Sequence, residues 1–138
     1  MQTFLPHADF ELSARALDKR RLGNQRNEAW VLLRASTGEI KGWSQHPASK
    51  MWVGHAHALA RYGIAMCQEF TRRGCADTVC ARFEEWLQNT TLPDKGDPPW
   101  LGSQAFHTAH QSNLVAKDPE YYGALWPNAP RGLPYVWP

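Results

Sequence analysis

Apolar side chains in residues 51–70 recur every three or four positions, which is the spacing of one face of an α-helix. Residues 14–35 and 79–87 repeat this spacing, and no segment alternates apolar and polar side chains over the length of a strand. The chain has 138 residues, a size that buries one hydrophobic core. We therefore expect one all-α domain over residues 1–138, built from roughly four helices.

Residue types that favour helix ends give the expected boundaries. Ser13 would cap a helix that runs to residue 35, with Gly23 allowing a bend or a close contact in its middle. His46-Pro47 would begin a long helix that ends at Arg72-Arg73-Gly74, where a basic last turn is followed by a glycine.

The remaining segments are expected to be shorter or irregular. Asp77 would cap a shorter helix, and Ser103 would begin another. Three prolines make residues 89–102 a loop. Residues 1–11 form an arm, and the last twenty residues, rich in proline, form an extended aromatic tail laid over the helices.

The basic residues are unevenly distributed along the chain. The formal net charge of +2 does not by itself require a nucleic-acid partner. Between residues 15 and 34, however, six basic side chains face two acidic ones, a local net charge of +4. A basic helix of this kind is typical of a surface that contacts phosphates.

Cysteine usage and the absence of long apolar runs indicate the compartment. An odd number of cysteines, three, without a secretory leader argues against a disulfide framework. Residues 1–6 do not have the pattern of a secretory leader, and no apolar run approaches the roughly 18 residues of a membrane span. We expect a soluble, cytoplasmic, reduced protein that does not enter a membrane and is a monomer.

Several short motifs follow one another in a recognisable order. Arg26-Asn27-Glu28-Ala29 lies on the basic helix, and Met51-Trp52-Val53-Gly54-His55 follows the His-Pro helix start. A helix with His107 and His110 then precedes Lys-Asp-Pro-Glu-Tyr-Tyr at residues 117–122. This succession resembles the pyrimidine-dimer DNA glycosylases of the endonuclease V type over nearly the whole chain.

The resemblance implies a fold, an activity and a partner. The fold would be a compact helical domain with the N-terminus among the helices. The enzyme would excise a damaged pyrimidine from double-stranded DNA and cut the strand at the resulting abasic site, without a cofactor or metal. In this family the chain's own α-amino group attacks the anomeric carbon of the sugar, displaces the base and forms an imine. A carboxylate on the first helix assists, and β-elimination then cuts the strand.

Carried onto this sequence, the resemblance assigns catalysis to Met1 and Glu28. Gln2 is bulky and normally leaves Met1 in place. An α-amino group has a pKa of about 7.7–8.0, so a fair fraction is neutral at physiological pH. Lys19 or Lys50 could supply the amine instead. Glu28 would stabilise the positively charged transition state of the sugar and move protons.

Basic, amide and aromatic side chains are the candidate DNA contacts. Arginines would hold phosphates, an amide would bond a base edge or phosphate, and aromatic rings would stack on exposed bases. The candidates are Arg20, Arg21, Gln25, Arg26, Lys50, His110, Tyr121 and Tyr122.

Two other functions remain open. A non-catalytic module of the same fold would bind damaged or modified DNA through the basic helix alone. A histidine-dependent metalloenzyme would use several of the histidines, of which His107 and His110 lie one helical turn apart. No His-Glu-x-x-His or Cys-x-x-Cys motif supports a metal, and we expect none.

Overall fold

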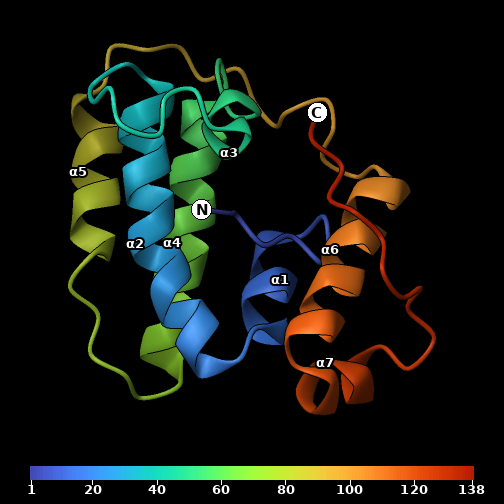
Figure 1. Ribbon diagram of the computed structural model, residues 1–138. Helices are drawn as coiled ribbons and strands as arrows, with labels where there is room; N and C mark the ends of the chain where they lie inside the picture. Colours follow the sequence, from blue (N-terminus) through green and yellow to red (C-terminus); the bar gives the residue numbers. More distant parts are fainter.

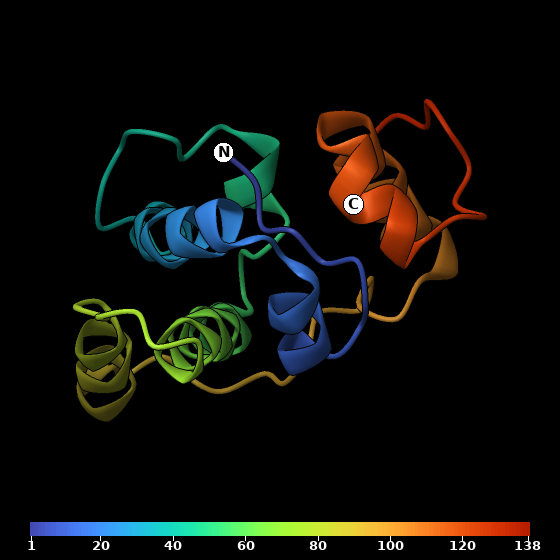
Figure 2. The ribbon, with the colours of Figure 1, turned by 90° about the horizontal axis from the view of Figure 1, so that it is seen from below.

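The computed structural model describes residues 1–138 and contains seven α-helices and no strands (Figure 1), which confirms the all-α prediction. Helices α1 to α5 form one group, and α6 and α7 form another, with the N-terminal arm running between the two groups (Figure 2). The helices are α1 (Phe10–Ala16), α2 (Lys19–Ser36), α3 (Pro47–Lys50), α4 (Ala56–Arg72), α5 (Cys80–Asn89), α6 (Gln104–Lys117) and α7 (Pro119–Leu125).

Helix α4 is the centre of the larger group. It packs against α2, α1 and α5, and its buried face includes Leu59, Tyr62 and Met66. Trp52 and Phe83 are fully buried beside it. The periodic apolar spacing of residues 51–70 therefore predicted the core correctly, because this stripe contacts three neighbouring helices.

The helix expected between residues 14 and 35 is two helices. The chain is extended at Leu17, and the carboxylate of Asp18 accepts a hydrogen bond from the backbone N–H of Arg21, which starts α2. Ser13 is not a cap; its Oγ accepts from His7 N and donates to His7 O at 3.1 and 2.9 Å. Asp9 caps α1 instead. The apolar spacing continues across the break because Leu17 is buried as well.

The long helix expected from His46-Pro47 to Arg73 is also divided. His46 accepts from Ala48 N and starts α3 as predicted, but α3 ends at Lys50. The chain then turns through Gly54, whose φ of 85° is in the left-handed region, before α4 begins. Met51 and Trp52 are buried within this turn and preserve the helical spacing without a continuous helix.

The C-terminal part agrees with its predicted boundaries except at one helix. Ser103 precedes α6, and residues 90–102 are a loop. Residues 119–125, expected to be extended, form α7, because the carboxylate of Asp118 accepts from Tyr121 N and Pro119 occupies the first turn. The chain beyond Trp126 has no regular structure.

The N-terminal arm joins the two groups of helices. Residues 2–6 are buried. On the α6 side, Leu5 N donates to His110 Nδ1 at 2.9 Å, and His107 Nδ1 lies 2.8 Å from Leu5 O. Gln111 donates to Pro6 O at 2.9 Å. Apart from its packing on α7, helix α6 is thus docked mainly onto the arm, with few contacts to α1 to α5.

None of the seven helices combines the length and the apolar character that crossing a bilayer requires.

We predict that Gly63→Ala destabilises the fold. A Cβ at position 63 would lie 2.7 Å from Cε2 of Phe83 and closer still to two other atoms of that ring. Overpacking of this kind costs about 1–3 kcal/mol of unfolding free energy. Urea denaturation measures the change. In the control Gly123→Ala, no atom lies within 4 Å of the added Cβ, and the helix α7 should be unaffected or slightly stabilised. Equal effects of the two substitutions would contradict the packing described.

Candidate functional site

The N-terminal amine and the Glu28 carboxylate face each other. Met1 N lies 4.0 Å from Glu28 Oε1, and the two side chains are 13% and 29% exposed. Glu28 lies in the middle of α2, and the arm brings Met1 alongside it. The structure therefore brings together the two residues that the sequence assigned to catalysis.

Burial and neighbouring groups act in opposite directions on Glu28. Loss of solvent raises the pKa of its carboxyl group. The positive amine of Met1, a hydrogen bond from Gln25 and the backbone amide of Gln2 each lower it, and the net shift is upward. A carboxyl group with a raised pKa can hold a proton more readily and give it up to a reacting group.

Gln25 lies beneath the pair. Its Nε2 donates to Glu28 Oε2 at 2.8 Å and to Gln2 O at 3.0 Å. Its Oε1 accepts from Phe4 N at 2.9 Å and from the Tyr62 hydroxyl. Because Gln25 is fully buried, it is not placed to contact DNA as the sequence suggested.

A basic hollow opens beside the Glu28 carboxylate. Its volume is about 220 Å³, and Glu28 is its one acidic side chain. Helix α2 supplies Arg20, Arg21 and Asn24 on the face of Glu28, and the end of α6 supplies Lys117. A second, shallower hollow of about 490 Å³ continues past Arg20 and Asn24, with Lys19 and Asn27 at its edge. The charge of this surface suits a phosphate backbone.

The sequence of the chain matches one known protein family. A model of the family described as pyrimidine dimer DNA glycosylase matches residues 1–81 of the chain, which is more than half of its 138 residues. The chain belongs to the pyrimidine dimer DNA glycosylase family. Comparison with curated proteins and with solved structures gave no match.

Membership of the glycosylase family implies a pyrimidine dimer DNA glycosylase activity, with DNA as the partner. The matched residues include Met1, Gln25, Glu28 and the arginines of α2. Lys117, Tyr121 and Tyr122 lie outside the matched range. The family relationship expected from the sequence is therefore confirmed.

Arg26 and Tyr122, expected to contact DNA, have partners inside the glycosylase fold. Arg26 Nη1 lies 2.6 Å from Asp77 Oδ1, and its guanidinium lies 3.8 Å from the centre of the Phe70 ring. Tyr122 is fully buried, and its hydroxyl donates to the carboxylate of Asp18. These side chains hold α2 to the α4–α5 loop and to α7, which the sequence could not reveal because the partners are distant along the chain.

The other predicted contacts are divided between surface and interior. Arg20, Lys50 and Tyr121 are exposed, while His110 is 1% exposed. Arg21 is partly exposed and pairs with Asp18 at 3.2 Å. His110 therefore serves the arm and is not placed to touch DNA.

His46 lies close enough to the Met1 amine for the charge of the amine to act on it, which the sequence did not reveal. Partial burial, and then the positive charge of the Met1 amine, lower the pKa of its imidazole. The rings of Trp43 and Trp137 contact it edge-on, with centroids 5.5 and 5.9 Å away. Trp43 is 48% exposed and has a left-handed φ of 67°. The His46-Pro47 pair predicted a helix start, but it did not predict that His46 contacts Trp43 and Trp137.

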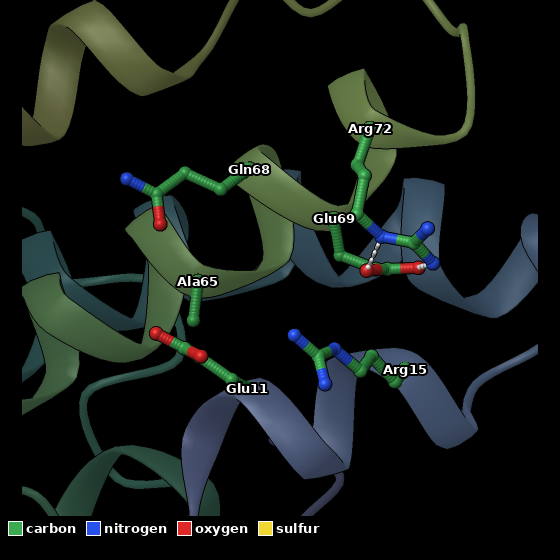
Figure 3. Close-up of a pocket in the computed structure, with 6 residues that line it drawn as sticks. All are labelled: Glu11, Arg15, Ala65, Gln68, Glu69 and Arg72. Atoms are coloured by element: carbon green, nitrogen blue, oxygen red, sulfur yellow. Dashed lines mark hydrogen bonds and ion pairs between the residues drawn. The ribbon is translucent and has the colours of Figure 1, made fainter.

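A hollow between α1 and α4 lies apart from these residues (Figure 3). Its volume is about 180 Å³, and Glu11 and Arg15 of α1 face Glu69 and Arg72 of α4 across it. Glu69 pairs with Arg72 and with Arg73, each at 2.7 Å. Because Glu69 is already paired with two arginines at the end of α4, we assign this hollow a structural role.

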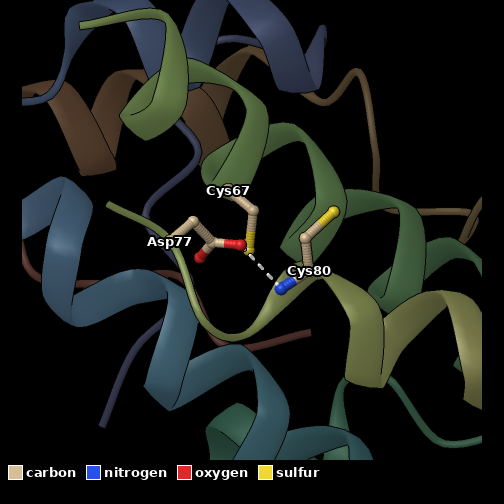
Figure 4. A group of neighbouring side chains, drawn as sticks. All are labelled: Cys67, Asp77 and Cys80. Atoms are coloured by element: carbon tan, nitrogen blue, oxygen red, sulfur yellow. Dashed lines mark hydrogen bonds between the residues drawn. The ribbon is translucent and has the colours of Figure 1, made fainter. Parts of the chain in front are cut away.

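The side chains with metal-ligand spacing are not histidines. Cys67, Asp77 and Cys80 have ligand atoms within 4.8 Å of one another, between α4 and the start of α5 (Figure 4). The Asp77 oxygens accept from Arg26, Val79 N and Cys80 N. Burial raises the pKa of the Cys67 thiol and raises that of Cys80 to about 11. Protonated thiols beside an occupied carboxylate favour a structural role, in which Asp77 bonds the start of α5 without being its predicted N-cap.

We predict that protonation of His110 weakens the fold in acid. Leu5 N donates to its Nδ1, and burial, followed by the charge of His107, lowers its pKa from 6.5 to about 3. The unfolded chain therefore binds more protons between these values. The stabilisation is complete above pH 6.5 and declines toward pH 3, by up to about 1.4 kcal/mol per pH unit.

Urea denaturation from pH 7 to pH 4 measures this dependence. His110→Asn keeps an acceptor for Leu5 N without a titrating group, so its unfolding free energy should fall less steeply with acid. The control His57→Asn, at a surface contact with Leu92 O, should keep the slope of the unchanged protein. A His110→Asn slope equal to that of the unchanged protein would show that His110 does not carry the effect.

Proposed function

We propose that the chain is a DNA repair glycosylase with abasic-site lyase activity, in which the α-amine of Met1 is the nucleophile and Glu28 the catalytic carboxylate. The observation that carries the proposal is the 4.0 Å separation of Met1 N and Glu28 Oε1 beside a basic hollow. The substrate is double-stranded DNA with a damaged pyrimidine or an abasic site.

The amine takes part in both steps of the reaction, the removal of the base and the cleavage of the strand. Its lone pair forms a bond to the anomeric carbon of the sugar, and the bond from this carbon to the base breaks, its electrons leaving with the base. Loss of the amine proton and opening of the sugar ring give an imine. Removal of a proton from the neighbouring sugar carbon then expels the 3′ oxygen and cuts the strand. A covalent intermediate of this kind divides one difficult step into easier ones.

Glu28 assists because its protonation state can change during the reaction. In its protonated form the carboxyl group, whose pKa is raised by burial, can give a proton to the opening sugar ring. In its ionised form it stabilises positive charge on the sugar and on the imine nitrogen. Its contact with the amine serves both roles.

The basic hollow positions the DNA backbone. Arg20, Arg21 and Lys117 come from both sides of the hollow and would hold the phosphates that flank the damaged nucleotide. A base within a duplex cannot reach Glu28, so the nucleotide must leave the stack. Exposed Trp43 and Tyr121 are available to stack on the displaced bases.

Lys117 is better placed than Lys19 or Lys50 to act as an alternative nucleophile. Lys19 and Lys50, suggested by the sequence, do not line the hollow beside Glu28, whereas Lys117 does. A lysine at this position would keep the imine chemistry if the α-amine did not react. The position of an adduct distinguishes the two amines.

We predict that borohydride traps the protein on duplex DNA that carries one abasic site. Reduction converts the imine into a stable amine, and mass mapping should place the adduct on the peptide that contains Met1. Glu28→Gln should lower the trapping rate by about 100-fold, a typical contribution of a positioned acid–base group. The control Glu85→Gln, exposed on α5, should trap at the rate of the unchanged protein.

The mapped position decides among the alternatives. An adduct on the Lys117 peptide would keep the lyase chemistry and reject Met1 as the nucleophile. A folded protein that binds the duplex without forming an adduct would contradict the enzyme and indicate the non-catalytic DNA-binding module.

We predict that Arg20→Gln and Lys117→Gln weaken binding to DNA of any sequence. If each side chain neutralises one phosphate, each substitution reduces the slope of log affinity against log salt concentration by about 0.9. Fluorescence anisotropy over a salt series measures both effects. By contrast, Arg26→Gln should act on stability, by about 3 kcal/mol, because it leaves the buried Asp77 unpaired. If Arg20→Gln and Lys117→Gln both kept the slope of the unchanged protein, the DNA would not bind in the basic hollow.

A further inference from the structure

The amide of Gln25 has only one orientation that satisfies its neighbours. Both Nε2 protons reach oxygens, on Gln2 and Glu28, and Oε1 accepts from Phe4 N and from the Tyr62 hydroxyl, whose one proton is shared with Phe4 O. Reversing the amide would set its oxygen against two acceptors and its NH₂ group against a backbone donor. Every hydrogen-bonding position of this fully buried amide is therefore used.

From this arrangement we infer that Gln25 is a positioning residue, which holds the Met1 amine and the Glu28 carboxylate in register for the reaction. The inference rests on the proposed function. Gln25 does not touch the substrate; it acts through the two groups that do.

Its contacts hold both partners of the reactive pair. The bond to Gln2 O fixes the second peptide of the chain, between Gln2 and Thr3, and the bond from Phe4 N fixes the arm two residues later. The bond to Glu28 Oε2 occupies the oxygen turned toward Gln25, and Oε1 lies 4.0 Å from the amine. One side chain thus determines the position of the amine and the choice of carboxylate oxygen.

Other contacts of the arm do not substitute for this one. Thr3 Oγ1 accepts from Trp52 Nε1 at 3.1 Å, and Leu5 is held by α6. These bonds hold the arm within the fold but reach neither Glu28 nor Gln2. Gln111, which donates to Pro6 O, is a glutamine of the same kind at a more distant point of the arm. It provides a matched control.

The experiment measures how strongly the amine and Glu28 are coupled, with Gln25→Met and Gln111→Met as the compared variants. Protein labelled with carbon-13 at the glutamate carboxyl carbon reports the titration of Glu28 by NMR. Because the amine charge lowers the pKa of Glu28, acetylating the N-terminus should raise it in the unchanged protein. This shift should be retained in Gln111→Met and reduced at least about threefold in Gln25→Met, where the pair is no longer held together.

The other groups that face Glu28 are the same in both variants. Arg20, Arg21 and Lys117 line the hollow, and the phenols of Tyr62 and Tyr135 are close enough for the Glu28 charge to act on them. If Gln25→Met does not fold, Gln25→Glu keeps the shape and both acceptor contacts at Oε1. It places a second carboxyl group against Glu28 and should raise the pKa of Glu28 by roughly one unit or more, with Gln111→Glu as its control.

Trapping on the abasic duplex supplies the second measurement. With the DNA saturated by protein, Gln25→Met should lose at least about tenfold in adduct formation, while its dissociation constant stays within about twofold of that of Gln111→Met. An acetylation shift in folded Gln25→Met, or in Gln25→Glu, equal to that of the unchanged protein would overturn the inference. If the unchanged protein forms no adduct, the proposed function fails, and the titration still decides whether Gln25 positions the pair.

Discussion

The fold depends on hydrogen bonds between the backbone of a buried, extended arm and side chains from the surrounding helices. An extended segment inside an all-helical protein has no neighbouring strand to pair with, and each unpaired backbone group would cost free energy. Here Gln25 and Tyr62 serve Phe4, and His107 and His110 serve Leu5. These side chains come from α2, α4 and α6, so the arm connects α6 to α2 and α4, which pack directly on each other.

The same arrangement explains the chemistry of the site. Placing an amine inside a helical domain requires a segment that can enter it, and the arm ends beside the exposed face of α2. Glu28 is partly buried there, which favours its protonated form, while the charge of the amine and the hydrogen bonds from Gln25 and Gln2 favour the ionised form. A carboxyl group balanced between two states is suited to proton transfer, and a fully exposed or fully paired carboxylate would lack this property.

The sequence predicts local features well and distant contacts poorly. The stripe on α4 and the cap at His46 follow from neighbouring residues, and the structure agrees with them. Asp77 accepts from the backbone at the start of α5 but is not its N-cap, which is Val79. Gln25 and Arg26 were expected at the surface because they are polar and lie on a basic helix. They are buried because the arm and Asp77, 51 residues beyond Arg26, supply partners that no local pattern reveals. Lys117 was not expected in the site because only the docking of α6 brings it to α2.

The contacts of the arm also determine at which stage of folding the site can form. The contact between Leu5 and His110 closes a separation of 105 residues, so it carries a large loop-closure entropy and belongs to the slow, non-local part of folding. During synthesis the N-terminal residues emerge long before α6, and until α6 docks, the arm lacks its partners on that side. Local opening of α6 in the finished protein would expose the arm again. The arm therefore has all its partners only in chains in which α6 has docked, which couples the surroundings of Met1 and Glu28 to the completeness of the fold.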